Sequence, residues 1–169
     1  QTHTSPMKGQ QVTNIEGVVT YTLKNGSSHY AVMQTPDDKA DDNVNTAEGI
    51  FVYLGNNVRG VKVGDHLRVS GIVDEYKIEG NEGDLLSTQI NASNGTVEVV
   101  ASDVTLPAPV AVKEDSLPRD VIDNDNFAKF DPDEDAIDYW ESLEGMRVSF
   151  SGVKATAPQA YGDISGVLD

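Results

Sequence analysis

The stretch DPDEDAIDYWESLEG, residues 131–145, gathers the side chains of this sequence that are best suited to hold a metal ion. Seven of its fifteen residues are carboxylates, and it contains no Lys or Arg. Hard cations such as Ca²⁺ and Mg²⁺ take several oxygen ligands, and irregular sites need no fixed sequence spacing. The candidate metal ligands are Asp131, Asp133, Glu134, Asp135, Asp138 and Glu141.

An EF-hand is the first form such a site could take. Three of the aspartates have the 1, 3, 5 spacing of the EF-hand loop, but Ala136 and Ser142 stand where the loop requires Gly and Glu. An EF-hand is therefore not expected. On a helix that includes Glu134, the side chains of Glu134, Asp138 and Glu141 would align, and a cation would relieve their mutual repulsion. An irregular Ca²⁺ or Mg²⁺ site is therefore retained as an alternative interpretation.

The same acids are also explained without a ligand, as the start of a helix over residues 136–144. Asp135 can cap this helix, Asp138 can complete the capping arrangement, and Gly145 can end it. Carboxylates at a helix N-terminus are favoured by the macrodipole. We favour this interpretation, in which the acids are in solvent and one apolar face of the helix packs on the rest of the protein. This face consists of Ile137, Trp140 and Leu143, with Trp140 as its anchor.

A second acidic segment, TPDDKADDN (35–43), raises the same question between two expected strands. Its aspartates could hold calcium, but clusters of this kind are usually solvated surface, and we favour a solvated loop.

The elements that must position these residues are mostly strands, because the apolar residues recur with a period of two. Residues 14–23 and 29–34 flank a tight KNGSS turn and predict a hairpin. A long strand over 65–78 contains Gly71, which we expect at a bend or bulge. Further strands are expected at 49–54, 83–90, 95–102, 146–153 and 161–168, with NASNG (91–95) as a turn.

Short twisted strands with glycine punctuation predict an all-β fold with an OB-fold-like small barrel. A C-terminal extension adds one short helix and additional strands. The expected organisation is a lead-in (1–11), the barrel (12–105), a Pro-rich and acidic strap (106–135), and a helix with strands that pack back on the barrel (136–169). We expect one structural unit, cut from a longer protein.

Charge limits the function classes. The chain has 12 Lys and Arg against 28 Asp and Glu, a net charge of −16. Such a surface repels polyanions, so any nucleic-acid contact must be a local exception. The exception would be aromatic side chains that stack bases beside a small cationic strip, although ordinary surface charge explains the strip equally. Its candidate residues are Tyr30, Phe51, Tyr53, Arg59, Lys62, His66, Arg68, Tyr76 and Lys77.

Five segments occur in an order that resembles a known family. They are SPMKGQQVTNIEGVVT (5–20), GIFVYL (49–54), VKVGDHLRVSGIVDEY (61–76), LPAPV (106–110) and AIDYWESLEGMRVS (136–149). Together they are similar to the OB-fold-like domain of bacterial extracellular nucleases, which precedes a catalytic domain of the endonuclease/exonuclease/phosphatase type. One departure is SHYAVMQT (28–35), where the family commonly has more aromatic residues.

The resemblance implies a secreted or cell-surface, non-catalytic module that positions a downstream catalytic domain of the same polypeptide and contacts single-stranded or duplex DNA weakly. The motifs of that catalytic domain are not in this sequence, so no enzyme is expected here. No apolar run is long enough for membrane insertion. Two alternatives stay open: a structural spacer without a ligand, and a calcium-dependent cell-surface or carbohydrate-binding module.

Overall fold

The structure is a computed structural model that describes residues 3–41, 43–77, 85–118, 122–159 and 164–168. Within these residues the chain is mostly strand, with one short α-helix and one 3₁₀ turn, as the period-two pattern predicts. The elements are β1 (Gln11–Asn25), β2 (Ser28–Gln34), β3 (Gly49–Gly55), β4 (His66–Tyr76), β5 (Ser87–Ala101), β6 (Val110–Val112), η1 (Glu114–Ser116), α1 (Ala136–Glu141), β7 (Val148–Phe150), β8 (Val153–Ala155) and β9 (Gly166–Leu168).

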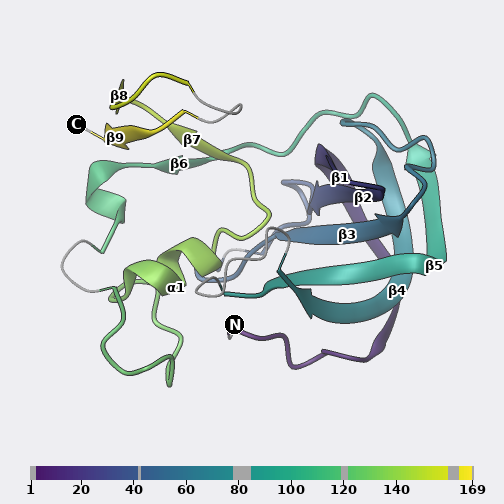
Figure 1. The fold of residues 1–169 in the computed structure, drawn as a ribbon, viewed down its shortest axis with the longest axis horizontal. Helices are drawn as coiled ribbons and strands as arrows, with labels where there is room; N and C mark the ends of the chain where they lie inside the picture. Colours follow the sequence, from purple (N-terminus) through teal and green to yellow (C-terminus); the bar gives the residue numbers. More distant parts are fainter. Residues whose placement is uncertain (1–2, 42, 78–84, 119–121, 160–163, 169) are drawn as a thin grey trace.

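Five strands form a small barrel in the order β1-β2-β3-β5-β4, and β4 pairs back with β1 (Figure 1). The β1–β2 hairpin turns at Gly26, whose φ of 58° is a left-handed conformation that glycine adopts readily. The parallel β3–β5 ladder is the shortest join, with three residue pairs from Phe51 to Tyr53. Five strands in a Greek-key barrel are the arrangement of an OB-like fold.

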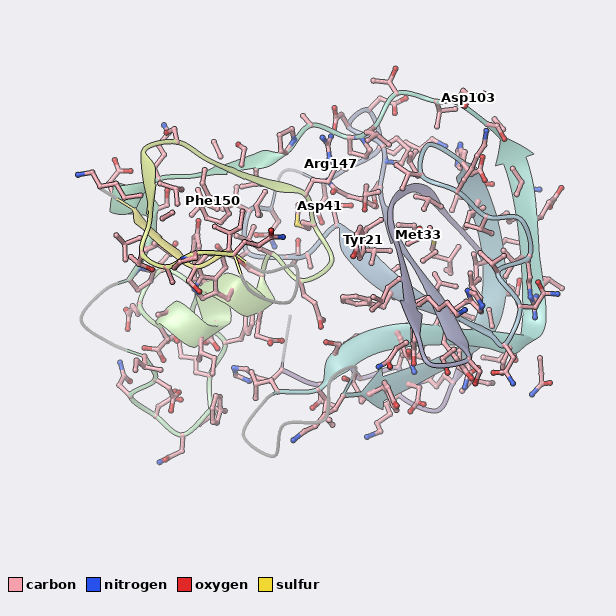
Figure 2. The ribbon with its side chains drawn as sticks, turned by 45° about the horizontal axis from the view of Figure 1, so that its top comes forward. Tyr21, Met33, Asp41, Asp103, Arg147 and Phe150 are labelled. Atoms are coloured by element: carbon pink, nitrogen blue, oxygen red, sulfur yellow. The ribbon has the colours of Figure 1, made fainter. Side chains whose placement is uncertain are left out.

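Apolar side chains from every barrel strand meet inside it. The core cluster is Val12, Val19, Ala31, Met33, Val52, Leu54, Val61, Leu67, Val69, Val73, Ile90 and Ala92. Leu67, Val69 and Val52 have no exposed surface. In Figure 2 the side chain of Met33 lies among the barrel strands. Burial of this surface is the main source of the barrel's stability.

The prediction of a turn at residues 91–95 is wrong. β5 runs unbroken from Ser87 to Ala101 beside β4, with a register shift between Ser70 and Ile72. The extra residues form a bulge, and the Arg59 guanidinium donates to three of its carbonyls, those of Ala92, Ser93 and Gly95, at 2.8 to 3.3 Å. Because a side chain satisfies these acceptors, the strand need not turn here.

Gly71 lies at the same point of β4, as the expected bulge requires. A Cβ on Gly71 would stand 2.4 Å from the carbonyl oxygen of Asn91. The glycine therefore permits the close approach of the two backbones where the register shifts.

The described residues between 102 and 168, here called the C-terminal extension, form a second layer beside the barrel (Figure 1). β6 pairs with β7 in parallel, and β8 pairs with β9 antiparallel. The single strand expected over residues 146–153 is two strands, because Gly152, with a φ of 75°, turns the chain between them. Part of the strand expected at 161–168 lies outside the described residues.

The helix is shorter than predicted. α1 ends at Glu141, and turns carry the chain to Gly145, where φ is 67°. The expected cap and the expected orientation are both wrong: the Asp135 side chain caps no backbone N–H, and the Trp140 side chain is 44% exposed. Leu143 is the residue of the expected apolar face that is buried.

The extension docks on the barrel through backbone contacts. Gly49 at the start of β3 lies so close to Gly145 that an added Cβ would stand 2.2 Å from the Gly145 carbonyl carbon. The Arg147 N–H donates to the side chain of Gln34 at 2.9 Å, and the Ala108 N–H donates to the Asp37 carboxylate at 3.0 Å. This line of contacts, here called the seam, holds the strap and the chain after α1 against the barrel.

Among the described residues, no helix has the length and apolar character needed to cross a membrane.

Candidate metal centre and candidate binding face

Two carboxylates at the N-terminal end of α1 are buried rather than solvated. Asp135, which precedes the helix, and Asp138, in its first turn, have no exposed surface. Asp138 accepts the backbone N–H of Asp131 at 2.8 Å and contacts the His3 imidazole. The prediction that the acids form the solvated side of the helix is therefore wrong for these two residues.

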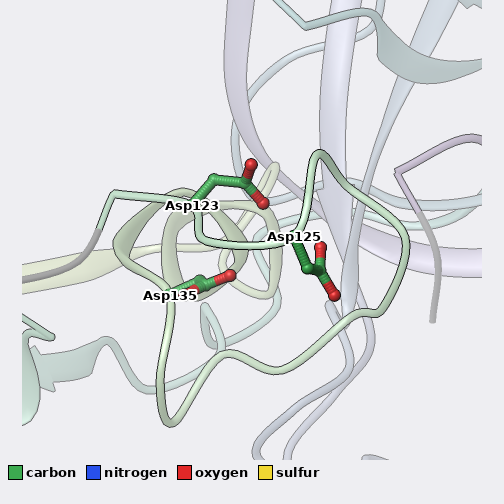
Figure 3. Close-up of side chains that lie close together, drawn as sticks. All are labelled: Asp123, Asp125 and Asp135. Atoms are coloured by element: carbon green, nitrogen blue, oxygen red, sulfur yellow. The ribbon is translucent and has the colours of Figure 1, made fainter.

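Asp135 belongs to two groups of carboxylates. Asp123, Asp125 and Asp135 offer oxygens that lie within 4.8 Å of one another, and so do Asp131, Asp135 and Asp138. Figure 3 shows the Asp123 and Asp135 carboxylates extending toward the side of the loop that carries Asp125. We call these five residues the acidic cluster.

Two oxygens of the cluster lack hydrogen-bond partners among the described residues. They are Oδ2 of Asp135 and Oδ1 of Asp131, and both are buried. The other oxygen of Asp135 accepts the Asn124 side-chain amide at 3.3 Å, and the other oxygen of Asp131 accepts the Lys129 ammonium at 2.7 Å. Buried acceptors without a donor are rare in folded proteins because their desolvation is uncompensated.

Burial raises the pKa of Asp135 above the usual range for aspartate. The backbone N–H of Asn124 opposes this shift, and the nearby charges of Asp131, Asp123 and Asp138 add to it. The cluster therefore concentrates negative charge where water does not reach the central carboxylate.

The structure brings together only part of the predicted ligand set. Asp131, Asp135 and Asp138 lie in the cluster, whereas Asp133 and Glu134 are exposed on its outside. Asp123 and Asp125 were not predicted as ligands, although they repeat the Asp-x-Asp spacing found at residues 131–135. That repeated spacing was the available signal.

The sixth predicted ligand, Glu141, faces the seam instead. It lines a cavity of about 210 Å³ together with Glu144, Ser5 and Gly49. Burial, with the neighbouring Glu144 carboxylate second, raises the pKa of Glu141 to about 7, and burial also raises the pKa of Glu144. The Glu144 carboxylate accepts the Thr88 N–H at 3.3 Å, which ties it to β5.

The acidic loop between β2 and β3 uses one of its aspartates to build its own turns. Asp41 accepts the Asn43 N–H at 2.7 Å, and its own N–H donates to Glu48 at 3.0 Å. The loop borders a cavity of about 360 Å³ that also contacts the extension at Ala108 and Leu143. Among the described residues, no group of metal ligands forms in this loop.

The predicted aromatic residues gather on the outer face of β2 and β3. Tyr30 pairs with Tyr53 across the two strands, and their ring centroids are 5.2 Å apart. Burial raises the pKa of Tyr30, and the neighbouring Tyr76 adds to the shift. Tyr76 is 43% exposed, whereas Tyr30 is buried. Phe51, on the same side of β3 as Tyr53, is half-buried.

The predicted cations are engaged elsewhere. Arg68 forms ion pairs with Glu16 at 2.9 Å and Glu98 at 3.1 Å, and its guanidinium lowers the pKa of Glu16. Lys62 lies 3.3 Å from Asp103, and His66 lies 3.5 Å from Glu16. Arg59 fills the β5 bulge. Lys77, at the end of β4, also has an interaction partner.

Distance also separates Arg68 from the aromatic residues, whereas Lys77 directly follows Tyr76 in the sequence. Arg68 and Tyr76 are eight residues apart on β4, which corresponds to roughly 26 Å of extended strand. The predicted residues therefore do not form one strip. The tyrosines occupy one part of the barrel, and the ion-paired Arg68 lies in another.

Comparisons with known proteins concern the C-terminal extension. A family model described as "Domain of unknown function (DUF8508)" matches residues 99–169, less than half of the chain. No curated protein and no solved structure matches. The matched segment begins at the end of β5 and contains the whole acidic cluster.

Proposed function

We propose that this chain is a non-catalytic, OB-like accessory module of a secreted bacterial nuclease. It positions a downstream catalytic domain of the same polypeptide and contacts nucleic acid weakly. The ordered motifs that resemble the extracellular nuclease domain support this proposal. The structural support is the tyrosine group on the β2–β3 face.

That face is where OB-folds bind oligonucleotides and oligosaccharides. Tyr30 on β2 is buried and supports the ring of Tyr53 on β3, so the rings available for stacking are Tyr53 and the exposed Tyr76. Aromatic faces stack bases with about 1–3 kcal/mol per base, without sequence preference. The face supplies stacking, and its charges supply little attraction for phosphate.

The paired cations explain why the expected affinity is low. Arg68 and Lys62 are held by carboxylates of the chain itself, and the whole chain carries −16. Counterion release, the main term in nonspecific DNA binding, needs cations that can replace salt on phosphate. Positioning of the catalytic domain is therefore the main role, and DNA contact is the secondary one.

A neutral saccharide is the second candidate ligand for the same face. The exposed Tyr76 beside Tyr53 favours it, because a sugar stacks on aromatic rings and brings no phosphate into the acidic surface.

Fluorescence anisotropy with a labelled oligo-dT 12-mer at low salt tests the DNA contact. We expect weak binding that is lost in Tyr53→Ala and kept in Phe150→Ala, a matched loss of an aromatic side chain on β7 (Figure 2). Binding weaker than about millimolar at low salt removes the DNA role, since low salt favours phosphate contacts. Saccharide binding that depends on Tyr53 would assign the face to the second candidate. The complete polypeptide should degrade DNA, and its failure to do so would overturn the nuclease assignment.

A further inference from the structure

We propose that Asp123, Asp125 and Asp135 bind one Ca²⁺ ion, which fastens the strap to the N-terminal end of α1. This inference does not depend on the proposed function, because its readouts involve no nucleic acid.

The oxygen positions fit one ion. Ca²⁺ binds oxygens at 2.3–2.6 Å, so two ligands of the same ion lie at most about 5 Å apart. The oxygens offered by the three aspartates are all within 4.8 Å of one another. They come from two arms of one loop, as Figure 3 shows, so an ion between them would close the loop.

The burial of Asp135 gives the independent reason to expect a ligand. Its side chain has no exposed surface, and its Oδ2 has no donor among the described residues. A hydrogen-bonded structural carboxylate would instead have both oxygens satisfied, as Asp138 has with His3 and the Asp131 N–H. A cation bound through Oδ2 of Asp135 would satisfy this orphaned oxygen.

Charge favours this group over its neighbour. Asp131 is paired with Lys129, and Asp138 contacts His3. No Lys, Arg or His among the described residues forms an ion pair with Asp123, Asp125 or Asp135. Asp123 accepts the N–H groups of Asn126 and Phe127, and Asp125 accepts that of Ala128, so these two are hydrogen-bonded but have no cationic partner. Three carboxylates within 4.8 Å repel one another, and a divalent cation reverses the sign of that interaction.

The ligand chemistry selects calcium. All three side chains offer only oxygen, and the ligands come from an irregular loop that also has backbone carbonyls to contribute. Mg²⁺ demands near-ideal octahedral geometry at shorter distances, whereas Ca²⁺ accepts six to eight oxygens in flexible arrangements. We therefore expect Ca²⁺ to bind more tightly than Mg²⁺.

Calorimetric titration of CaCl₂ into the chain, after removal of metal with EDTA, measures the site. We expect one ion per chain, and binding at least tenfold weaker in Asp135→Asn. Asp133→Asn is the matched control, since Asp133 lies in the same loop but is exposed. It should bind within twofold of the wild type. Absence of binding up to 10 mM Ca²⁺, or unchanged binding in Asp135→Asn, would overturn the proposal.

Thermal unfolding separates an ion site from a structural carboxylate. At a hundredfold excess over Kd, Ca²⁺ should raise the wild-type Tm by roughly 5–10 °C. In EDTA, the Tm of Asp135→Asn should be higher than that of the wild type, because the change removes repulsion between carboxylates. In Ca²⁺, the Tm of the variant should be lower than that of the wild type. If Asp135→Asn lowers Tm equally in both buffers, Asp135 has a purely structural role and the proposal is wrong. If Asp135→Asn does not fold, Asp125→Asn gives the same two readings from a partly exposed position.

Discussion

The barrel and the C-terminal extension bury different kinds of side chain. The fully buried side chains of the barrel are mainly aliphatic, such as Leu67 and Val69. In the extension, Val112 shares full burial with Asp135 and Asp138. Hydrophobic burial responds little to ions, whereas buried carboxylates depend on protons and cations. The two regions should therefore respond differently to the same changes of sequence and solution.

The largest expected effect is in the barrel core. Leu67→Ala should lower the free energy of unfolding by about 2–5 kcal/mol, because it removes a fully buried side chain and leaves a cavity. Leu143→Ala, the same change in the extension, should cost less, since Leu143 lies at the edge and is 9% exposed. Urea unfolding followed by circular dichroism measures both values. Equal losses would contradict the distinction between the two regions.

The seam should be next in sensitivity. Gly49→Ala forces a Cβ into the backbone of Gly145, and we expect a loss of about 1–3 kcal/mol with release of the extension. Hydrogen exchange should then rise in β6 to β9 before it rises in β1 to β5. Gly152→Ala is the control for a glycine replacement in the extension, because nothing lies within 4 Å of its Cβ. Its positive φ, which Gly49 does not share, makes the control change strain the backbone but leaves the seam untouched. Uniform exchange in Gly49→Ala would show that the two regions unfold together.

The β5 bulge tests how the barrel tolerates irregular backbone. Arg59→Met should cost about 1–2 kcal/mol, since it leaves the carbonyls of Ala92, Ser93 and Gly95 without their donor. Lys62→Met removes an exposed cation next to the same region and should change stability by less than about 0.5 kcal/mol. If the two variants are equally stable, the guanidinium does not hold the bulge.

The smallest expected effect comes from Glu141 at the seam. Its pKa is raised to about 7 in the folded chain, so its protonated form is favoured by folding. This contribution is complete below pH 4.5 and is lost as pH rises through 7. In EDTA, Glu141→Gln should therefore add about 1 kcal/mol at pH 8, after allowance for solvent screening, and little at pH 4. Glu134→Gln, an exposed control, should show no such dependence. Equal gains at both values of pH would contradict the raised pKa.

Local patterns predicted the barrel better than the extension. Alternation along residues 14–34 and 65–78 was enough for the β1–β2 hairpin and for β4, because each strand has one face in the core. NASNG reads as a turn because its residues favour turns locally. Whether this segment turns or continues as a strand depends on Arg59, which is more than thirty residues away in the sequence. A local sequence pattern does not include it.

The candidate metal centre was harder to predict for the same reason. The helix macrodipole already explains a carboxylate in the first helical turn, so there was no reason to predict from the sequence that Asp138 is buried. Its burial depends on His3 at the other end of the chain and on the Asp131 backbone. Asp123 and Asp125 were visible as acids, but their approach to Asp135 depends on how the strap folds back.

The long β4–β5 ladder has a mechanical consequence. β5 leads directly into the strap, so tension applied at the C-terminal side reaches the barrel along the axis of this strand. β5 pairs with β4 at ten positions, and such a ladder under shear must lose many hydrogen bonds at once. The seam resists the same pull with a few separate bonds, such as that between Ala108 and Asp37. Under load the extension would peel away first, and the barrel would remain as an intact anchor.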